Sequence, residues 1–204
     1  MRHFLLALAL LLLVGLTAQA QQMPAFTFGL KGGASLTSLT NRNLESSRYL
    51  WGFHAGLTGN YALTTNFSLQ IEGLYSQKGV RDDSYVRGTS YAERLRLHYL
   101  DAPLLVRFRA AGAYFEVGPQ LGLLLSAHNY VDSPTASTPD LVVTSDYHRV
   151  DLGLASGIGY QLASGLGLGL RTNVGLLNVP KNNYSGTAVR NNVFQFYLTY
   201  QFTH

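Results

Sequence analysis

The stretch F-Q-F-Y-L-T-Y-Q-F at residues 194–202 decides the fold, because its side chains alternate between two faces without a fault. One face is apolar and is formed by Phe194, Phe196, Leu198, Tyr200 and Phe202. The other face is smaller or more polar and is formed by Gln195, Tyr197, Thr199 and Gln201. A period of two residues predicts a β-strand whose two faces meet different surroundings.

The same period recurs along the chain and predicts eight strands. They cover residues 26–39, 50–61, 66–79, 95–109, 114–126, 148–161, 165–177 and 193–203. Each is long enough for a tilted membrane crossing of about 9–11 residues. The connections at 62–65, 110–113 and 162–164 are short, and those between them are long and polar. This asymmetry predicts an all-β, eight-stranded antiparallel transmembrane β-barrel, with both termini and the short turns in the periplasm.

The first twenty residues resemble an export signal rather than a membrane helix. Arg2 forms a short basic head, and the uncharged run at 4–16 is too short to span a bilayer. The small residues Ala18 and Ala20 suit a signal peptidase, so we expect cleavage after Ala20. The predicted organisation is a signal peptide at 1–20 and one outer-membrane β-barrel domain at 21–204.

Composition excludes several other classes of protein. The 15 basic residues less Arg2 leave 14 against 11 acidic ones, and this small excess gives no case for nucleic-acid binding. The absence of cysteine excludes a disulfide-stapled scaffold and a lipid-modified N-terminal cysteine. After residue 20 no apolar run reaches the 18 residues of a membrane helix, so strands must carry the membrane crossing.

Six stretches of the chain carry a family resemblance. They are K-G-G-A-S-L-T-S-L (31–39), G-F-H-A-G-L (52–57), S-L-Q-I-E-G-L-Y-S-Q-K-G (68–79), Y-L-D-A-P-L-L-V-R (99–107), E-V-G-P-Q-L-G-L-L-L-S-A (116–127) and G-L-G-L-G-L-R (165–171). Over almost the whole mature chain, the sequence resembles the PorT-type outer-membrane β-barrel family of Bacteroidetes. The resemblance implies an eight-stranded barrel in a Gram-negative outer membrane, and one member of that family belongs to a protein-secretion system.

The chain departs from the usual pattern at two places. Such barrels often end on an aromatic residue that the insertion machinery reads, whereas here Thr203 and His204 follow Phe202. We therefore expect a shifted membrane-insertion signal, formed by Phe194, Phe196, Leu198, Tyr200 and Phe202. Pro103 and Pro119 lie inside predicted strands, where each removes a ladder donor, so local bulges are expected at both.

If the apolar faces look outward, eight charged side chains point into the lumen. They are Lys31, Arg107, Arg109 and Arg171 with Glu72, Asp101, Glu116 and Asp151. Eight strands enclose a space that side chains can fill, so these charges are expected to form a paired structural core rather than a channel. The turn at 110–113 predicts Arg107 opposite Glu116, and the turn at 62–65 predicts Gly56 opposite Glu72, with His54 one diagonal step away.

Other candidate sites have simpler explanations. His128, Asp146 and His148 lack the spacing of a metal site, and the glycines at 165, 167 and 169 are interpreted as small inward residues beside arginines rather than a nucleotide fingerprint. No catalytic, cofactor-binding or metal-binding residue is therefore predicted. A girdle of outward aromatic side chains is expected from Trp51, Phe53, Tyr61, Tyr75 and Tyr200.

The favoured function is that of a non-enzymatic barrel acting through surface loops or envelope partners, in adhesion, envelope integrity or secretion assembly. Its expected partners are outer-membrane lipid, periplasmic chaperones, the barrel-insertion machinery and envelope or secretion-system proteins. An enzyme on lipid or peptide and a narrow channel stay open as alternatives. The enzyme would draw on loop residues Asp82, Asp83, Ser84, Ser90, Glu93 and His98. A soluble lipocalin-like barrel is disfavoured by the charges at mid-strand on the face opposite the apolar one.

Overall fold

The computed structural model describes residues 26–40, 47–86, 89–132, 141–182 and 188–202. Its long strands are β1 (Phe26–Thr40), β3 (Leu50–Ala62), β4 (Phe67–Val86), β5 (Thr89–Ala110), β6 (Ala113–Asp132), β8 (Val150–Gln161), β9 (Leu166–Gly175) and β10 (Arg190–Gln201). Three short elements accompany them, namely β2 (Ser47–Arg48), β7 (Leu141–Val142) and the 3-10 helix η1 (Thr144–Asp146). Within these ranges, no helix has the length and apolar character needed to cross a membrane.

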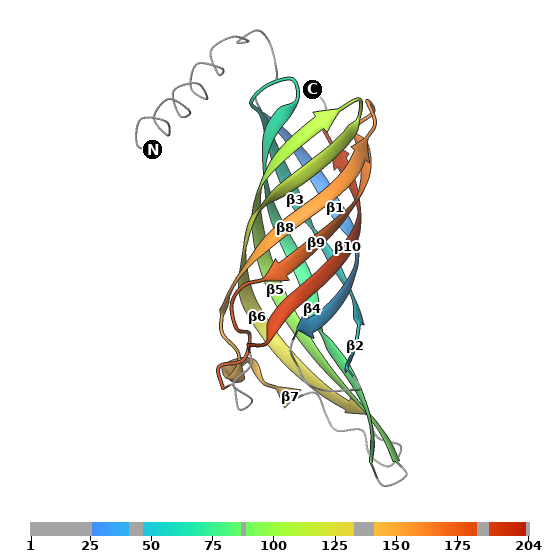
Figure 1. Cartoon of the computed structure of the whole chain (residues 1–204), viewed down its shortest axis with the longest axis vertical. Helices are drawn as coiled ribbons and strands as arrows, with labels where there is room; N and C mark the ends of the chain where they lie inside the picture. Colours follow the sequence, from blue (N-terminus) through green and yellow to red (C-terminus); the bar gives the residue numbers. More distant parts are fainter. Residues whose placement is uncertain (1–25, 41–46, 87–88, 133–140, 183–187, 203–204) are drawn as a thin grey trace, which may run out of the picture.

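The eight long strands form one closed antiparallel sheet. Each long strand pairs with its neighbours in the chain, and β10 pairs with β1 from Gly29↔Gln201 to Thr40↔Arg190, which closes the ring. Figure 1 shows the strands tilted around a common axis. The predicted all-β, eight-stranded antiparallel barrel is confirmed.

The period of two in the sequence separates the lumen from the outer surface. Along β10, alternate side chains from Asn191 to Thr199 are buried, and those between them are mostly exposed. The outer surface is apolar, with Trp51 63% exposed and Leu168 59% exposed. Such an apolar surface is stable against the hydrocarbon of a lipid bilayer, whereas its exposure to water would be unfavourable.

The two ends of the barrel differ in length and shape. At one end, called here the turn end, lie the short connections at 63–66, 111–112 and 162–165, together with the C-terminal end of β10. At the other, called the loop end, β4, β5 and β6 run far beyond the other strands (Figure 1). These three strands have 20, 22 and 20 residues, whereas β9 has 10.

The aromatic girdle is placed differently from the prediction at one position. Trp51, Phe53, Tyr61 and Tyr200 are exposed on the outer surface. Tyr75, however, is only partly exposed and lies in the middle of β4, because β4 continues to Val86 rather than ending at residue 79. Tyr75 therefore marks no strand end.

The prediction of bulges at Pro103 and Pro119 is wrong. The β5–β6 register is the same at Pro103↔Gln120 and at Val106↔Val117, and its shift falls instead between His98 and Tyr99. A proline removes one ladder donor, and the strand tolerates that loss without an extra residue. The sequence carried no signal for the shift at His98.

The predicted pairing of Gly56 with Glu72 is also wrong, because Thr58 faces Glu72 and Gly56 faces Leu74. The last pair before the turn joins Ala62 to Ser68, and Leu63 N–H and Thr64 N–H both donate to the Phe67 carbonyl. This connection is as long as the predicted turn at 62–65 but lies one residue later, so the partner of every β3 residue moves by two positions.

Candidate functional site in the barrel lumen

Two carboxylates share one arginine in the middle of the lumen. Arg171 donates to Glu72 through Nη1 at 2.7 Å and Nη2 at 2.8 Å, and to Glu116 through Nε at 2.9 Å. All three side chains are almost completely buried. Because strands β4, β6 and β9 contribute one member each, this cluster joins opposite walls of the barrel.

Two more cations complete this mid-lumen network. Lys31 Nζ lies 3.2 Å from Glu72 Oε2, and Arg107 donates to Glu116 Oε2 through Nη2 at 2.7 Å. Each cation also lies on an aromatic ring, Lys31 over Tyr197 at 3.7 Å and Arg107 over Tyr114 at 3.9 Å. Arg107 and Glu116 are register partners in the β5–β6 ladder. Ion pairs in which each group makes several hydrogen bonds stabilise buried charges in the absence of water.

Two glycines of the lumen make room for tyrosines rather than for arginines, and Gly167 makes room for Thr199. A Cβ atom on Gly159 would lie 2.3 Å from the Tyr114 ring, and one on Gly169 would lie 2.5 Å from the Tyr197 ring. Gly165, which was expected to face the lumen beside an arginine, instead lies in the turn before β9 with a φ of +87°. Tyr114 and Tyr197 therefore reach across the lumen, and their hydroxyls meet at 3.1 Å.

A second charged cluster lies nearer the loop end. Lys78 Nζ lies 2.9 Å from Asp101 and 3.5 Å from Asp151, and Asn191 Nδ2 donates to Asp151 at 2.8 Å. The ammonium also lies 4.3 Å from the centre of the Tyr99 ring. Lys78 was not among the sequence candidates, although it falls on the same face of β4 as Glu72 and was detectable by that period alone.

An apolar cluster closes the lumen beyond these charges. It consists of Leu39, Val80, Leu95, Leu97, Tyr99, Leu124, Ala127, Val179 and Val189, with Val143 and Tyr147 packed against it. Strands contribute most of this cluster, and the segment after β9 adds Val179. Two backbone hydrogen bonds hold Val179 in place: His148 N–H donates to the Val179 carbonyl, and Val179 N–H donates to the Val189 carbonyl. Sequence reasoning missed this cluster because its inward side chains are as apolar as the lipid-facing ones.

Arg109 lies apart from both charged clusters. Seven of the eight predicted lumen charges fall into the two clusters, whereas Arg109 is partly buried at the turn end and donates to Gln161 Oε1 at 2.9 Å. In the part of the chain that the structure describes, no carboxylate lies within ion-pair distance of it.

The remaining candidates form no recognisable catalytic or metal site among the described residues. His54 is buried beside Ser35, with Oγ and Nδ1 2.9 Å apart, but both side chains are only 1% exposed, so no substrate reaches them. No three His, Cys, Asp or Glu side chains gather as a metal site in the ranges described, and His128, Asp146 and His148 are no exception. Of the enzyme candidates, Asp82 faces Glu93, and the side chains of Asp83, Ser84 and Ser90 lie outside the description.

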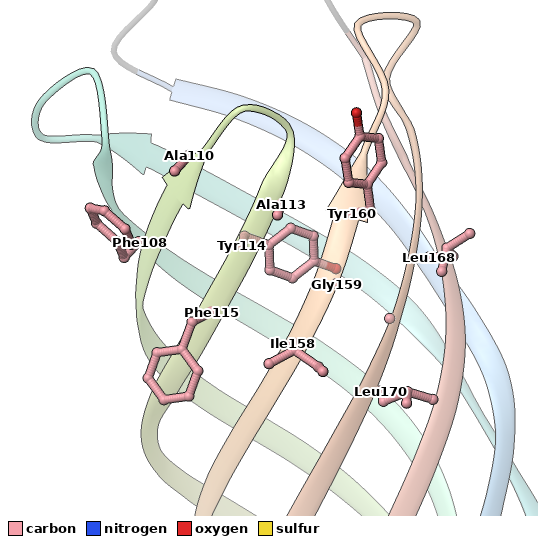
Figure 2. A pocket seen from close by; sticks show the side chains of 11 residues that line it. Phe108, Ala110, Ala113, Tyr114, Phe115, Ile158, Gly159, Tyr160, Leu168 and Leu170 are labelled. Atoms are coloured by element: carbon pink, nitrogen blue, oxygen red, sulfur yellow. The ribbon is translucent and has the colours of Figure 1, made fainter.

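One hollow lies on the outer surface rather than in the lumen. It measures about 490 Å³ and is lined by residues of β5, β6, β8 and β9, among them Phe115, Ile158, Tyr160 and Leu168 (Figure 2). Its lining is almost entirely apolar. An apolar hollow on this surface suits contact with the hydrocarbon of the bilayer.

The comparison with protein families agrees with this architecture. The family model described as "Outer membrane protein beta-barrel domain" matches residues 17–180. Similar solved structures include the attachment invasion locus protein Ail of Yersinia pestis, at 11% identity over 88% of this chain and 100% of that chain, with a TM-score of 0.48. Neisserial surface protein A has 14% identity over 87% and 97% (TM-score 0.48), and OprG from Pseudomonas aeruginosa has 13% over 91% and 100% (TM-score 0.47). No curated protein matches the chain.

Proposed function

Because the chain belongs to the outer membrane protein beta-barrel domain family and lies in the cell outer membrane, we propose that it is a closed, non-enzymatic barrel acting through its loop end. Its partners at that end are envelope or extracellular molecules, in adhesion, envelope integrity or secretion assembly. The observation that carries this proposal is the filled lumen. The mid-lumen network, the Lys78 cluster and the apolar cluster lie one after another along the barrel.

A filled lumen disfavours the channel alternative. Arg171, Glu72 and Glu116 link opposite walls at mid-lumen, and Leu97 and Leu124 are completely buried at the loop end. An ion would have to separate buried ion pairs and then cross apolar side chains, and both steps are costly. We expect no steady single-channel current from the purified barrel in planar bilayers. Large, stable currents would contradict the closed barrel and favour transport.

The loop end offers a surface suited to binding a partner outside the membrane. Strands β4, β5 and β6 have 20 to 22 residues, roughly twice the 9–11 that a membrane crossing needs. Their outer halves therefore project from the bilayer as a three-stranded sheet, and inward side chains of these halves form much of the apolar cluster. An ordered sheet outside the membrane offers a binding surface at little entropic cost.

A capture experiment tests this role. In the variant, an Asn-Gly turn replaces residues 84–91, so that this two-residue turn joins the paired Asp83 and Ala92 and the projecting β4–β5 hairpin becomes shorter. Ala111→Asn, at the positive-φ position of the opposite end, serves as the control. We expect wild type and control to capture the same envelope proteins from native outer membrane, and the shortened variant to lose them. Equal capture by all three would contradict the proposal.

The proposal also covers the origin of the barrel, its export and its orientation in the membrane. We propose a PorT-type barrel of Bacteroidetes, exported by a signal peptide cleaved after Ala20, carried by periplasmic chaperones and inserted through the aromatic face of β10. The turn end then faces the periplasm. Protease added to intact cells should cut within 127–147 or 178–192 and spare 110–113. Cleavage at the short turns alone would invert this orientation, and Met1 on the mature protein would exclude the export signal.

A further inference from the structure

We propose that the turn end of the lumen binds a phosphate group and that Arg109 is the cation that holds it. The site is an open cavity of about 260 Å³, called here the vestibule. It is separate from the proposed partner surface, which lies at the opposite end of the barrel. Its access from the periplasm rests on the orientation proposed above.

The vestibule is polar because inward positions of five strands meet there. Thr27 of β1, Asn60 of β3, Ser68 of β4, Arg109 of β5 and Gln201 of β10 all line it. The turn after β3 forms part of its rim. Each of these five side chains carries at least one N–H or O–H donor, and the lining contains no acidic side chain.

Arg109 is held in place by neutral groups. The backbone N–H of Arg109 donates to the Asn66 backbone carbonyl at 2.7 Å, and Asn66 Nδ2 donates to the Arg109 backbone carbonyl at 2.8 Å. The guanidinium donates through Nη2 to Gln161 Oε1, and Gln161 is itself anchored by its Nε2, which donates to the Gly165 carbonyl at 2.9 Å. This arrangement positions the guanidinium in advance and leaves its charge uncompensated by the described residues.

The charge balance of the neighbouring lumen favours an anion at this end. The mid-lumen network contains three cations, Lys31, Arg107 and Arg171, against two carboxylates, Glu72 and Glu116. One positive charge is therefore in excess there. Arg107, one of these cations, lies two residues before Arg109 on the same inward face of β5, so Arg109 adds a second positive charge.

A phosphate group fits this combination of charge and donors. A guanidinium offers planar N–H pairs that match phosphate oxygens, and charge-assisted hydrogen bonds are the stronger kind. The hydroxyls of Thr27 and Ser68 can satisfy further oxygens. Such a group can come from a free phosphate or phosphomonoester, or from the headgroup of a phospholipid in the adjoining leaflet.

The test titrates inorganic phosphate into the full-length barrel in nanodiscs of zwitterionic phosphatidylcholine. The readouts are calorimetry and the Nε–Hε resonances of arginine. We expect saturable binding that shifts the Arg109 resonance, and Arg109→Gln should weaken the affinity by roughly tenfold or more, since a charged hydrogen-bond partner is lost. Arg190→Gln, exposed at the loop end, is the matched control and should leave the affinity unchanged.

Three results overturn the proposal: no saturable binding in the wild type, equal affinity in a folded Arg109→Gln variant, or the same resonance shift from sodium chloride at equal ionic strength. A second series replaces part of the lipid with phosphatidylglycerol. A lower apparent affinity for phosphate in those discs supports the proposal with the headgroup as the source. An unchanged affinity supports it with the free anion as the source.

Discussion

Replacing Glu116 by glutamine tests the mid-lumen network most directly. The carboxylate is fully buried and accepts hydrogen bonds from Arg107 at 2.7 Å, Arg171 Nε at 2.9 Å and the Tyr197 hydroxyl at 2.9 Å. Glu116→Gln keeps the shape but raises the excess of cations in the network from one to two. Removing one partner of a buried ion pair costs about 3–5 kcal/mol, so we expect a loss of that size in unfolding free energy.

The assay is equilibrium urea unfolding of the barrel in lipid vesicles. Glu93→Gln makes the same chemical change at a partly buried carboxylate that accepts from Asn129, and it should cost less than about 1 kcal/mol. The double variant Glu116→Gln/Arg107→Met should recover part of the loss, because it removes a cation left without its partner. Equal small losses for Glu116→Gln and Glu93→Gln would refute the reasoning.

Two further predictions use the same unfolding assay. Leu168→Arg places a charge on the lipid-facing surface and should lower the unfolding free energy by about 2–4 kcal/mol. The control Ala163→Arg, in an exposed turn, should lower it by less than about 0.5 kcal/mol. Similar losses for the two variants would show that Leu168 does not face lipid. Gly169→Ala places a Cβ 2.5 Å from the Tyr197 ring and should cost about 1–3 kcal/mol. Gly73→Ala meets nothing within 4 Å and should be neutral or slightly stabilising, so the reverse order of the two glycine variants would exclude the proposed packing.

The lumen is closed at one end and open at the other, and this difference separates the two proposals. At the loop end, apolar side chains such as Leu97 and Leu124 exclude water, so contacts there must use the outside of the projecting sheet. At the turn end, Arg109 remains beside an open polar cavity, where a small solute can enter. Exchange between the two ends would require the mid-lumen ion pairs to open.

The sequence by itself determined the number of long strands and the direction in which their side chains face. A period of two residues is a local property, because successive side chains of an extended chain point to opposite sides. It therefore placed Lys31, Glu72 and Arg171 inward and Leu168 outward without any tertiary knowledge. The short turn predicted at 110–113 also allowed the Arg107–Glu116 register to be counted, and the structure confirms that pair.

Only the tertiary structure decided which inward side chains meet. Arg171 reaches Glu72 across 99 positions of sequence, and no local pattern states that distance. The connection after β3 lies one residue later than the sequence predicted, which moved the β3–β4 pairs by two positions, because the place of the turn sets the register. The sequence also did not predict the apolar cluster or the separation of Arg109 from the two charged clusters. Both depend on the heights at which side chains of different strands lie along the barrel axis. Closure of the sheet fixes those heights, and the local sequence does not.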